Sequence, residues 1–152
     1  MTNLKIFKIK NVKTPERFGK NAGIDFFVPK DFNKGKPFLL KPRENILIGS
    51  GIKISMPEEY CMIAFNKSGI ATKYGLQVGA CVVDENYTGE IHLHVFNYSN
   101  IDTWIKPNQK LIQFIMIAPN YIKIEQVESL DKLFAGVDIN ERGEHGFGST
   151  GE

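Results

Sequence analysis

Short runs in which apolar and polar residues alternate limit the possible folds of this chain more than any other feature. Three such runs cover residues 6–10, 52–56 and 91–96, and a period of two residues is typical of strands with one buried face. No segment keeps the 3.6-residue period of a long amphipathic helix. The pattern therefore predicts an all-β protein built from short strands.

Turn-forming residues and two longer apolar runs refine this prediction. The runs at residues 46–54 and 111–118 are nearly continuously apolar, so we expect each to be a strand buried on both faces. Residues 68–75 are the best helix candidate, with Ser68 as its N-cap and Gly75 as its end. Many short strands with one short helix predict a β-sandwich, a jelly roll or a closed barrel.

Composition and charge exclude several classes of protein. With 152 residues, 42% hydrophobic and 24% charged, the chain has the make-up of a soluble globular domain. The net charge of +2 comes from scattered lysines, so no nucleic-acid surface is indicated. No run is long and apolar enough for a membrane span or a signal peptide, which predicts a cytoplasmic protein.

The counts of a few residue types add three smaller predictions. Sixteen lysines against three arginines suggest AT-rich coding, as in a phage, a virus or a low-GC bacterium, so the cytoplasm could be that of an infected host cell. Cys61 and Cys81 are expected to be free thiols rather than a disulfide. His92 and His94 share one face of a strand, where solvated positions are favoured over a zinc site.

Residues 128–152 differ from the rest of the chain, because they carry Gly, Glu, Ser and Thr with few core-type residues. Such an end is often a disordered tail. However, Arg142 can bind phosphate oxygens at two points and Phe147 offers a ring on which a base can stack. We therefore expect a β domain at residues 1–130, followed at residues 131–152 by either a disordered tail or a flexible Gly-rich arm that closes over a nucleotide.

Two further segments carry polar groups that suit a nucleotide site. Residues 66–70 lie at an expected strand-to-helix junction, where Lys67 and Ser68 could bind an anion or serve only as a solvated lysine and an N-cap. Residues 79–91 are expected to form a β-hairpin with Asp84 at a strand end and Tyr87 near the turn. Asp84 could cap that turn or hold a water molecule for attack.

Five segments, taken in order, resemble the five motifs of the trimeric dUTP pyrophosphatases (dUTPases), and together they cover nearly the whole chain. The segments are Ala22-Gly23-Ile24-Asp25, Lys67-Ser68-Gly69, Val83-Asp84 to Tyr87 with Gly89-Glu90, Lys110-Leu111-Ile112-Gln113, and Arg142-Gly143 with Gly146 to Gly151. The chain departs from the family at several positions, among them Lys67 and Lys110, which replace arginines and so lose the planar two-point grip on phosphate.

The resemblance implies a distorted jelly roll or β-barrel that forms a homotrimer, with sites at the subunit interfaces. It implies Mg²⁺-dependent hydrolysis of dUTP to dUMP and pyrophosphate, which keeps uracil out of DNA and supplies dUMP for thymidylate synthesis. Asp84 would activate the attacking water, Tyr87 would exclude a 2′-hydroxyl group, and Asp25 would hold Mg²⁺ through water. The implied substrate contacts are Lys67, Ser68, Gly69, Cys81, Val82, Val83, Tyr87, Ile91, His92, Gln113, Arg142, Phe147, Gly148, Ser149 and Thr150.

Two alternatives share parts of this pattern. A dCTP deaminase has the same fold, but its chemistry needs a glutamate as proton shuttle in the strand after the turn. Residues 91–96 contain no carboxylate, which argues against it. The other alternative is a non-catalytic protein that binds a nucleotide or a regulatory protein, and the presence of Asp84, Tyr87 and Phe147 argues against lost catalysis.

Overall fold

The computed structural model describes residues 3–137. It divides into two compact units, with the boundary between Pro119 and Asn120. All the strands found among these described residues lie in the first unit, and their bounds are β1 Lys5–Lys8, β2 Ile24–Phe27, β3 Phe38–Leu40, β4 Asn45–Gly49, β5 Ile52–Ser55, β6 Cys61–Asn66, β7 Leu76–Val78, β8 Val82–Val83, β9 His92–Asn97, β10 Thr103–Ile105 and β11 Lys110–Ile117. Its helices are the 3₁₀ turn η1 (Phe32–Gly35) and α1 (Ser68–Tyr74), while α2 (Leu130–Leu133) belongs to the second unit.

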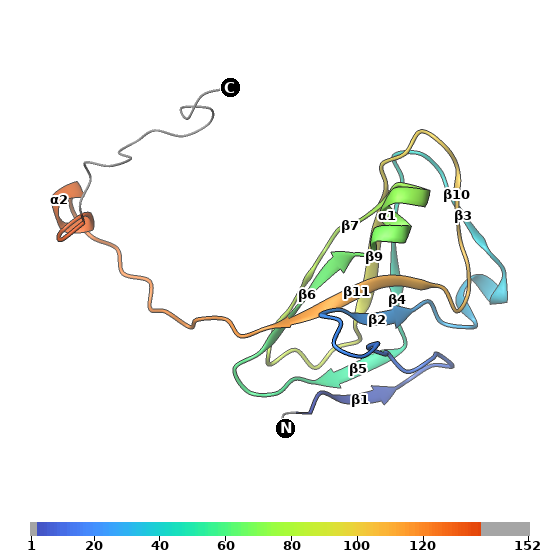
Figure 1. The fold of residues 1–152 in the computed structure, drawn as a ribbon, viewed down its shortest axis with the longest axis horizontal. Helices are drawn as coiled ribbons and strands as arrows, with labels where there is room; N and C mark the ends of the chain where they lie inside the picture. The colour runs from blue at the N-terminus through green and yellow to red at the C-terminus, as the bar shows by residue number, and fades with distance from the viewer. Residues whose placement is uncertain (1–2, 138–152) are drawn as a thin grey trace. The chain divides into compact units, whose positions relative to one another are not determined.

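The strands pair antiparallel in four sheets (Figure 1). The largest has the order β2-β11-β6-β8, so that the last strand in the sequence lies between two much earlier ones. A second sheet has the order β4-β9-β7, and the remaining two are the pairs β1-β5 and β3-β10. Within residues 3–137 the sheets do not join into one closed barrel, and the all-β, jelly-roll-like prediction is confirmed.

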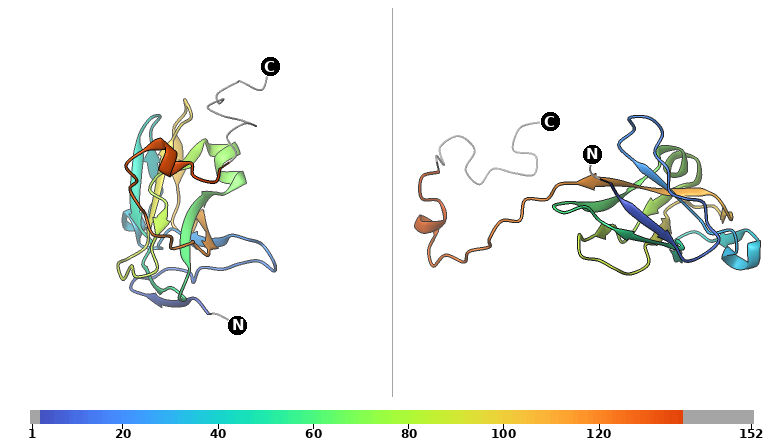
Figure 2. Two further views of the ribbon diagram at one scale, coloured as in Figure 1. Left: turned by 90° about the vertical axis from the view of Figure 1, so that its left-hand side faces the viewer. Right: turned by 90° about the horizontal axis from the view of Figure 1, so that it is seen from below.

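The core lies between these sheets and is apolar. Phe26 of β2 and Phe114 of β11 are 0% and 1% exposed, and their rings are 4.7 Å apart at 60°. This tilted arrangement favours contact between a ring edge and a ring face. Because β11 crosses the unit beside β2 and β6 (Figures 1 and 2), its buried residues connect the central sheet to the rest of the core.

The two long apolar runs behave differently from each other. Leu111 and Ile112 of β11 are both buried, and consecutive strand residues point to opposite faces, so the first part of β11 is buried on both faces as predicted. The prediction for residues 46–54 is wrong. The run is divided into β4 and β5 by a turn in which Gly51 has φ 75°, and Leu47 of β4 is 58% exposed.

The short helix is confirmed at α1, and Gly75 ends it in the left-handed conformation with φ 63°. Ser68 is not its N-cap, however. Lys67 occupies that position in extended conformation and no side chain caps the helix, so Ser68 is the first helical residue. The single turn α2 was not predicted. It begins after Ser129, whose hydroxyl accepts a hydrogen bond from the Lys132 amide at 3.3 Å.

Three smaller findings concern residues singled out in the sequence. Cys61 and Cys81 are free thiols, as predicted, although both are only partly buried. No group of three metal-binding side chains occurs in the described part of the chain, which includes His92 and His94. No helix among the described residues is long and apolar enough to cross a membrane.

Candidate functional site

The segment that carries Asp84 and Tyr87 is a loop between two sheets rather than the simple hairpin that was predicted. β8 pairs with β6, whereas β9 pairs with β4 and β7. The hairpin partners are β7 and β9, and their pairing continues to a hydrogen bond from the Gly79 amide to the His94 carbonyl at 3.0 Å. Residues 79–91 thus leave the hairpin, add a two-residue strand to the neighbouring sheet and return.

Residues 79–91 and the strands beside them enclose a small cavity of about 200 Å³. The lining residues come from the loop, from the first residue of β9 and from the core of β11. They are Ala80, Cys81, Val82, Val83, Asp84, Tyr87, Glu90, Ile91, His92 and Phe114. The predicted site residues that lie here are Cys81, Val82, Val83, Asp84, Tyr87, Ile91 and His92.

Asp84 lies directly after β8 and is exposed at the cavity, so its carboxylate is accessible to water. The loop turns back immediately, because the Tyr87 amide donates a hydrogen bond to the Asp84 carbonyl at 3.2 Å. The Tyr87 hydroxyl donates a further bond to the Glu90 carbonyl at 3.0 Å. Gly89 makes this fold possible, since a Cβ there would lie 2.3 Å from the Tyr87 hydroxyl.

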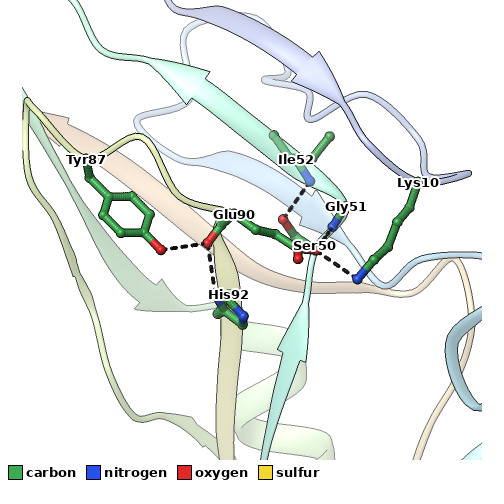
Figure 3. Close-up of polar contacts among 7 residues, drawn as sticks. All are labelled: Lys10, Ser50, Gly51, Ile52, Tyr87, Glu90 and His92. Carbon is green, nitrogen blue, oxygen red and sulfur yellow. Dashed lines mark hydrogen bonds and ion pairs between the residues drawn. The ribbon is translucent and has the colours of Figure 1, made fainter.

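The carboxylate of Glu90 points away from the loop and binds Gly51, in the turn between β4 and β5, and Lys10, which follows β1 (Figure 3). Its Oε1 atom accepts bonds from the Gly51 amide at 2.7 Å and from Lys10 Nζ at 2.9 Å. Partial burial raises the pKa of Glu90, but the bonds from Lys10 and Gly51 and the nearby positive charge outweigh this, so the pKa lies below its ordinary value of 4.5.

A second group of predicted residues lies at one end of the four-stranded sheet β2-β11-β6-β8. Lys67, just before α1, bonds to Oδ1 of Asp25 on β2, and Lys110 of β11 lies 3.3 Å from Oδ2 of the same carboxylate. Lys110 also pairs with Glu16 at 2.6 Å. The hydrogen bond to Glu16 is the main reason that the pKa of Lys110 lies above its ordinary value; desolvation opposes this, and Asp25 adds to it.

The remaining members of this second group follow the same strands. Gln113 of β11 donates to the Asn66 carbonyl at 2.8 Å, and Ser68 and Gly69 lie exposed at the start of α1. Gly23 is needed for the contact between its segment and β11, because a Cβ there would lie 2.1 Å from Oε1 of Gln113. The group thus presents two ammonium groups, an amide and a hydroxyl, which suit phosphate oxygens.

The two groups are far apart within one chain. The register pairs Val83 with Met62, which places Asp84 beside the Cys61 end of β6, while Lys67 follows the opposite end. Positions 61 and 67 are six residue-to-residue steps apart along extended chain, or about 20 Å at ~3.3 Å per step. None of the second group lines the cavity, so one chain does not bring all the described site residues together.

Five predicted residues, Arg142, Phe147, Gly148, Ser149 and Thr150, lie outside the described residues. Conversely, the sequence reasoning missed Lys10 and His94. The Ala80 amide donates to His94 Nδ1 at 2.7 Å, so this histidine holds the start of the loop rather than being a solvated strand position. The two histidines on one face were visible in the sequence, but Lys10 gave no signal because it contacts Glu90 only through the fold.

Comparisons with known proteins identify the family of the chain and its relatives. The sequence matches the family profile described as dUTPase over residues 11–151. A deoxyuridine 5′-triphosphate nucleotidohydrolase of Fusobacterium nucleatum is 33% identical over 98% of this chain and 97% of its own length. The mouse protein of the same name is 31% identical over 86% of this chain and 73% of its own length.

Solved structures show the same fold. A mutant dUTPase of Staphylococcus bacteriophage 80alpha with dUpNHpp has a TM-score of 0.80 at 23% identity, with both chains covered completely. A mutant dUTPase of S. aureus phage phi11, described with a structural Mg(II) ion, has a TM-score of 0.70 at 22% identity. The match to the phi11 protein covers 85% of this chain and 99% of that protein.

Proposed function

This chain belongs to the dUTPase family and is a dUTP diphosphatase, and from that premise we propose that Asp84 activates the water that cleaves dUTP. The observation that carries the proposal is the cavity that Asp84 and Tyr87 line together with residues 80–83. An exposed carboxylate at the rim of a small, partly apolar cavity can orient a water molecule and take its proton.

The cavity suits the nucleoside half of the substrate. Cys81, Val82 and Val83 lie along one side, and main-chain groups on this side can bind the polar edge of uracil. Phe114 closes the core side, and the Tyr87 ring is held by its hydroxyl at the side where the sugar would lie. A ring fixed in this way leaves no room for a 2′-hydroxyl group, which would make the site selective for deoxyribose.

The separation of the two groups supports sites shared between subunits, as in the homotrimer that the family resemblance implies. Asp84 must lie within hydrogen-bond reach of the water that attacks the phosphate chain, while Lys67, Ser68, Gly69 and Gln113 must contact that same chain. A distance of about 20 Å along β6 prevents one copy from doing both. We therefore assign the base and the sugar to one subunit and the phosphates to Lys67 and its neighbours on the next. Residues 131–152 of a further subunit would form the arm that covers the site.

Mg²⁺ fits this arrangement. It usually keeps several waters and is held by one or two carboxylates plus substrate phosphates, so the single half-buried carboxylate of Asp25 is sufficient. Lys67 and Lys110 occupy both oxygens of Asp25 here, and substrate phosphates would draw these ammonium groups away. When bound, the ion would neutralise charge on the phosphate oxygens, while the chain itself orients the water and the nucleoside.

The structure fits a deaminase less well than a dUTP diphosphatase. A deaminase needs a carboxylate in the strand after the loop, but β9 has none, and Glu90 bonds to Gly51 and Lys10 outside the loop.

A cytoplasmic location, of an infected host cell if the source is a phage or virus, stays a prediction of the sequence.

The test is a pyrophosphate-release assay with dUTP and Mg²⁺. Wild-type protein should release pyrophosphate and no ammonia, and Asp84→Asn should lose turnover by ~10² or more while still binding a non-hydrolysable dUTP analogue. Ammonia release would indicate the deaminase. Analogue binding without turnover in the wild type would indicate a regulatory protein.

A further inference from the structure

Glu90 is connected to the candidate site by its main chain and to the neighbouring sheet by its side chain. The Glu90 carbonyl accepts hydrogen bonds from the Tyr87 hydroxyl at 3.0 Å and from His92 Nδ1 at 2.9 Å (Figure 3). Both of these side chains line the cavity. The position of one peptide group therefore determines where two walls of the cavity lie.

The carboxylate fixes this peptide group from the other side. Glu90 Oε1 is bonded to the Gly51 amide and to Lys10 Nζ, and only 20% of the Glu90 side chain is exposed. Lys10 follows β1 and Gly51 lies in the turn between β4 and β5, so the anchor joins three segments distant in sequence. The adjacent amide of Ile91 donates to the Ile52 carbonyl at 2.9 Å, which adds a main-chain bond at the same point.

Two glycines leave space for the pair. A Cβ at Gly49 would lie 2.6 Å from Glu90 Oε1 and 2.9 Å from Lys10 Nζ. At Gly51, whose φ is +75°, a Cβ would lie 2.8 Å from the Cβ of Lys10. Side chains at these two positions would therefore displace the ion pair, and the local structure is adapted to hold it.

We propose that Lys10 and Glu90 are positioning residues that set the width of the nucleoside cavity through the Glu90 carbonyl. The proposal rests on the assignment of dUTP's nucleoside half to this cavity. Neither side chain contacts the substrate. Their loss lets the residue 84–90 segment shift, so that the Tyr87 ring no longer closes tightly on the sugar. The effect falls on binding and on sugar selection rather than on the carboxylate of Asp84.

The test compares Lys10→Met and Glu90→Gln with Lys8→Met, an exposed lysine of β1 that serves as the matched control. Each of the two variants should raise the Kd of a non-hydrolysable dUTP analogue and the KM for dUTP by about tenfold, the effect expected for one charge-assisted bond. The kcat should stay within about threefold. The ratio of kcat/KM for dUTP over UTP should fall, whereas Lys8→Met should match the wild type.

The double variant Lys10→Met/Glu90→Gln provides the decisive comparison. Because both changes remove the same ion pair, its effect should equal that of the more severe single variant rather than the product of the two. Gly49→Ala should give the same phenotype by displacing the pair while keeping both side chains. If Glu90→Gln does not fold, Lys10→Met and Gly49→Ala still provide the test, because both variants keep the Glu90 carboxylate.

A lower melting temperature with unchanged Kd, KM and dUTP/UTP ratio would show a merely structural pair and overturn the proposal, as would multiplicative effects in the double variant. Failure of the underlying site assignment looks different. In that case Tyr87→Ala would leave the dUTP/UTP ratio unchanged. If Tyr87→Ala lowers the ratio and Lys10→Met does not, only the positioning proposal is wrong.

Discussion

Gly79→Ala should destabilise the protein through a single steric conflict. Gly79 packs against the His94 ring, and a Cβ there would lie 2.1 Å from Nδ1 and 2.4 Å from Cε1. An ordinary contact begins at 3.4 Å, so the ring or the chain must move by about 1.3 Å, the difference from 2.1 Å. A shift of this size breaks the hydrogen bond from the Ala80 amide to Nδ1, which is 2.7 Å long.

The cost follows from these two effects. Overpacking costs ~1–3 kcal/mol and the lost hydrogen bond ~0.5–1.5 kcal/mol. Since the φ of Gly79 lies outside the left-handed region, alanine also restricts the unfolded chain and returns ~0.4–1 kcal/mol. The central values give a net loss of about 2 kcal/mol, within limits of ~0.5–4 kcal/mol, and about 2 kcal/mol lowers the melting temperature by roughly 4–8 °C for a chain of this length.

The assay is thermal unfolding at one fixed protein concentration, because assembly would make the melting temperature depend on concentration. Gly69→Ala is the matched control for stability. Nothing lies within 4 Å of a Cβ there, and alanine in a helix should be neutral or stabilising by up to ~1 kcal/mol. His94→Ala added to Gly79→Ala should relieve the conflict and recover part of the loss. A melting temperature within about 1–2 °C of the wild type, or strict additivity in the double variant, would refute the packing argument.

Three further predictions concern the site, and a fourth concerns its anchor. Tyr87→Ala should raise UTP hydrolysis relative to dUTP, and an unchanged ratio would place sugar selection elsewhere. Deleting residues 141–152 should cut activity by ~10² or more with little change in melting temperature, given the charge-assisted bonds assigned to the arm; full activity in the truncated protein would count against the arm. Phe147→Trp should change its fluorescence when a non-hydrolysable dUTP analogue and Mg²⁺ are added, with the unmodified protein as the control for Trp104. Finally, the pKa of Glu90 is lowered by folding, so its ionised carboxylate should stabilise the folded protein fully above about pH 4.5. This stabilisation should be lost as the pH falls below that value. The difference in melting temperature between wild type and Glu90→Gln should therefore shrink at about pH 3, and a difference that grows there would contradict the sign.

Hydrophobic alternation and turn residues in the sequence predicted the strands and helix ends that depend on neighbouring residues alone. The alternation at residues 91–96 identified β9, and the αL position of Gly75 ended α1 where the sequence predicted. The run at residues 46–54 misled because hydrophobicity alone does not reveal a tight turn. Gly51 is the residue that marks that turn, and its positive φ could have been suspected from the Ser50-Gly51 pair.

Members of the candidate site could be proposed from the sequence, but their arrangement could not. Asp84, Tyr87, Asp25 and Lys67 were predicted as site residues by motif resemblance, and the structure puts the first two at one cavity. Their division into two groups depends on the register between β6 and β8, which no local pattern encodes. For the same reason the partnership of Lys10 with Glu90, eighty residues apart, could not be predicted.

The position of β11 has a consequence for how the protein is synthesised. The central sheet has the order β2-β11-β6-β8, so the strand that joins β2 to β6 emerges from the ribosome last among the strands. Until then both earlier strands have an open edge, and neither Lys110 nor Gln113 is present to meet Asp25 and Asn66. Pairings between distant segments form slowly because the chain must first close long loops. A ribosome stalled before residue 110 would hold a nascent chain with exposed strand edges and without two of its proposed phosphate-binding residues. Such a chain would be prone to associate with other nascent chains on the same mRNA.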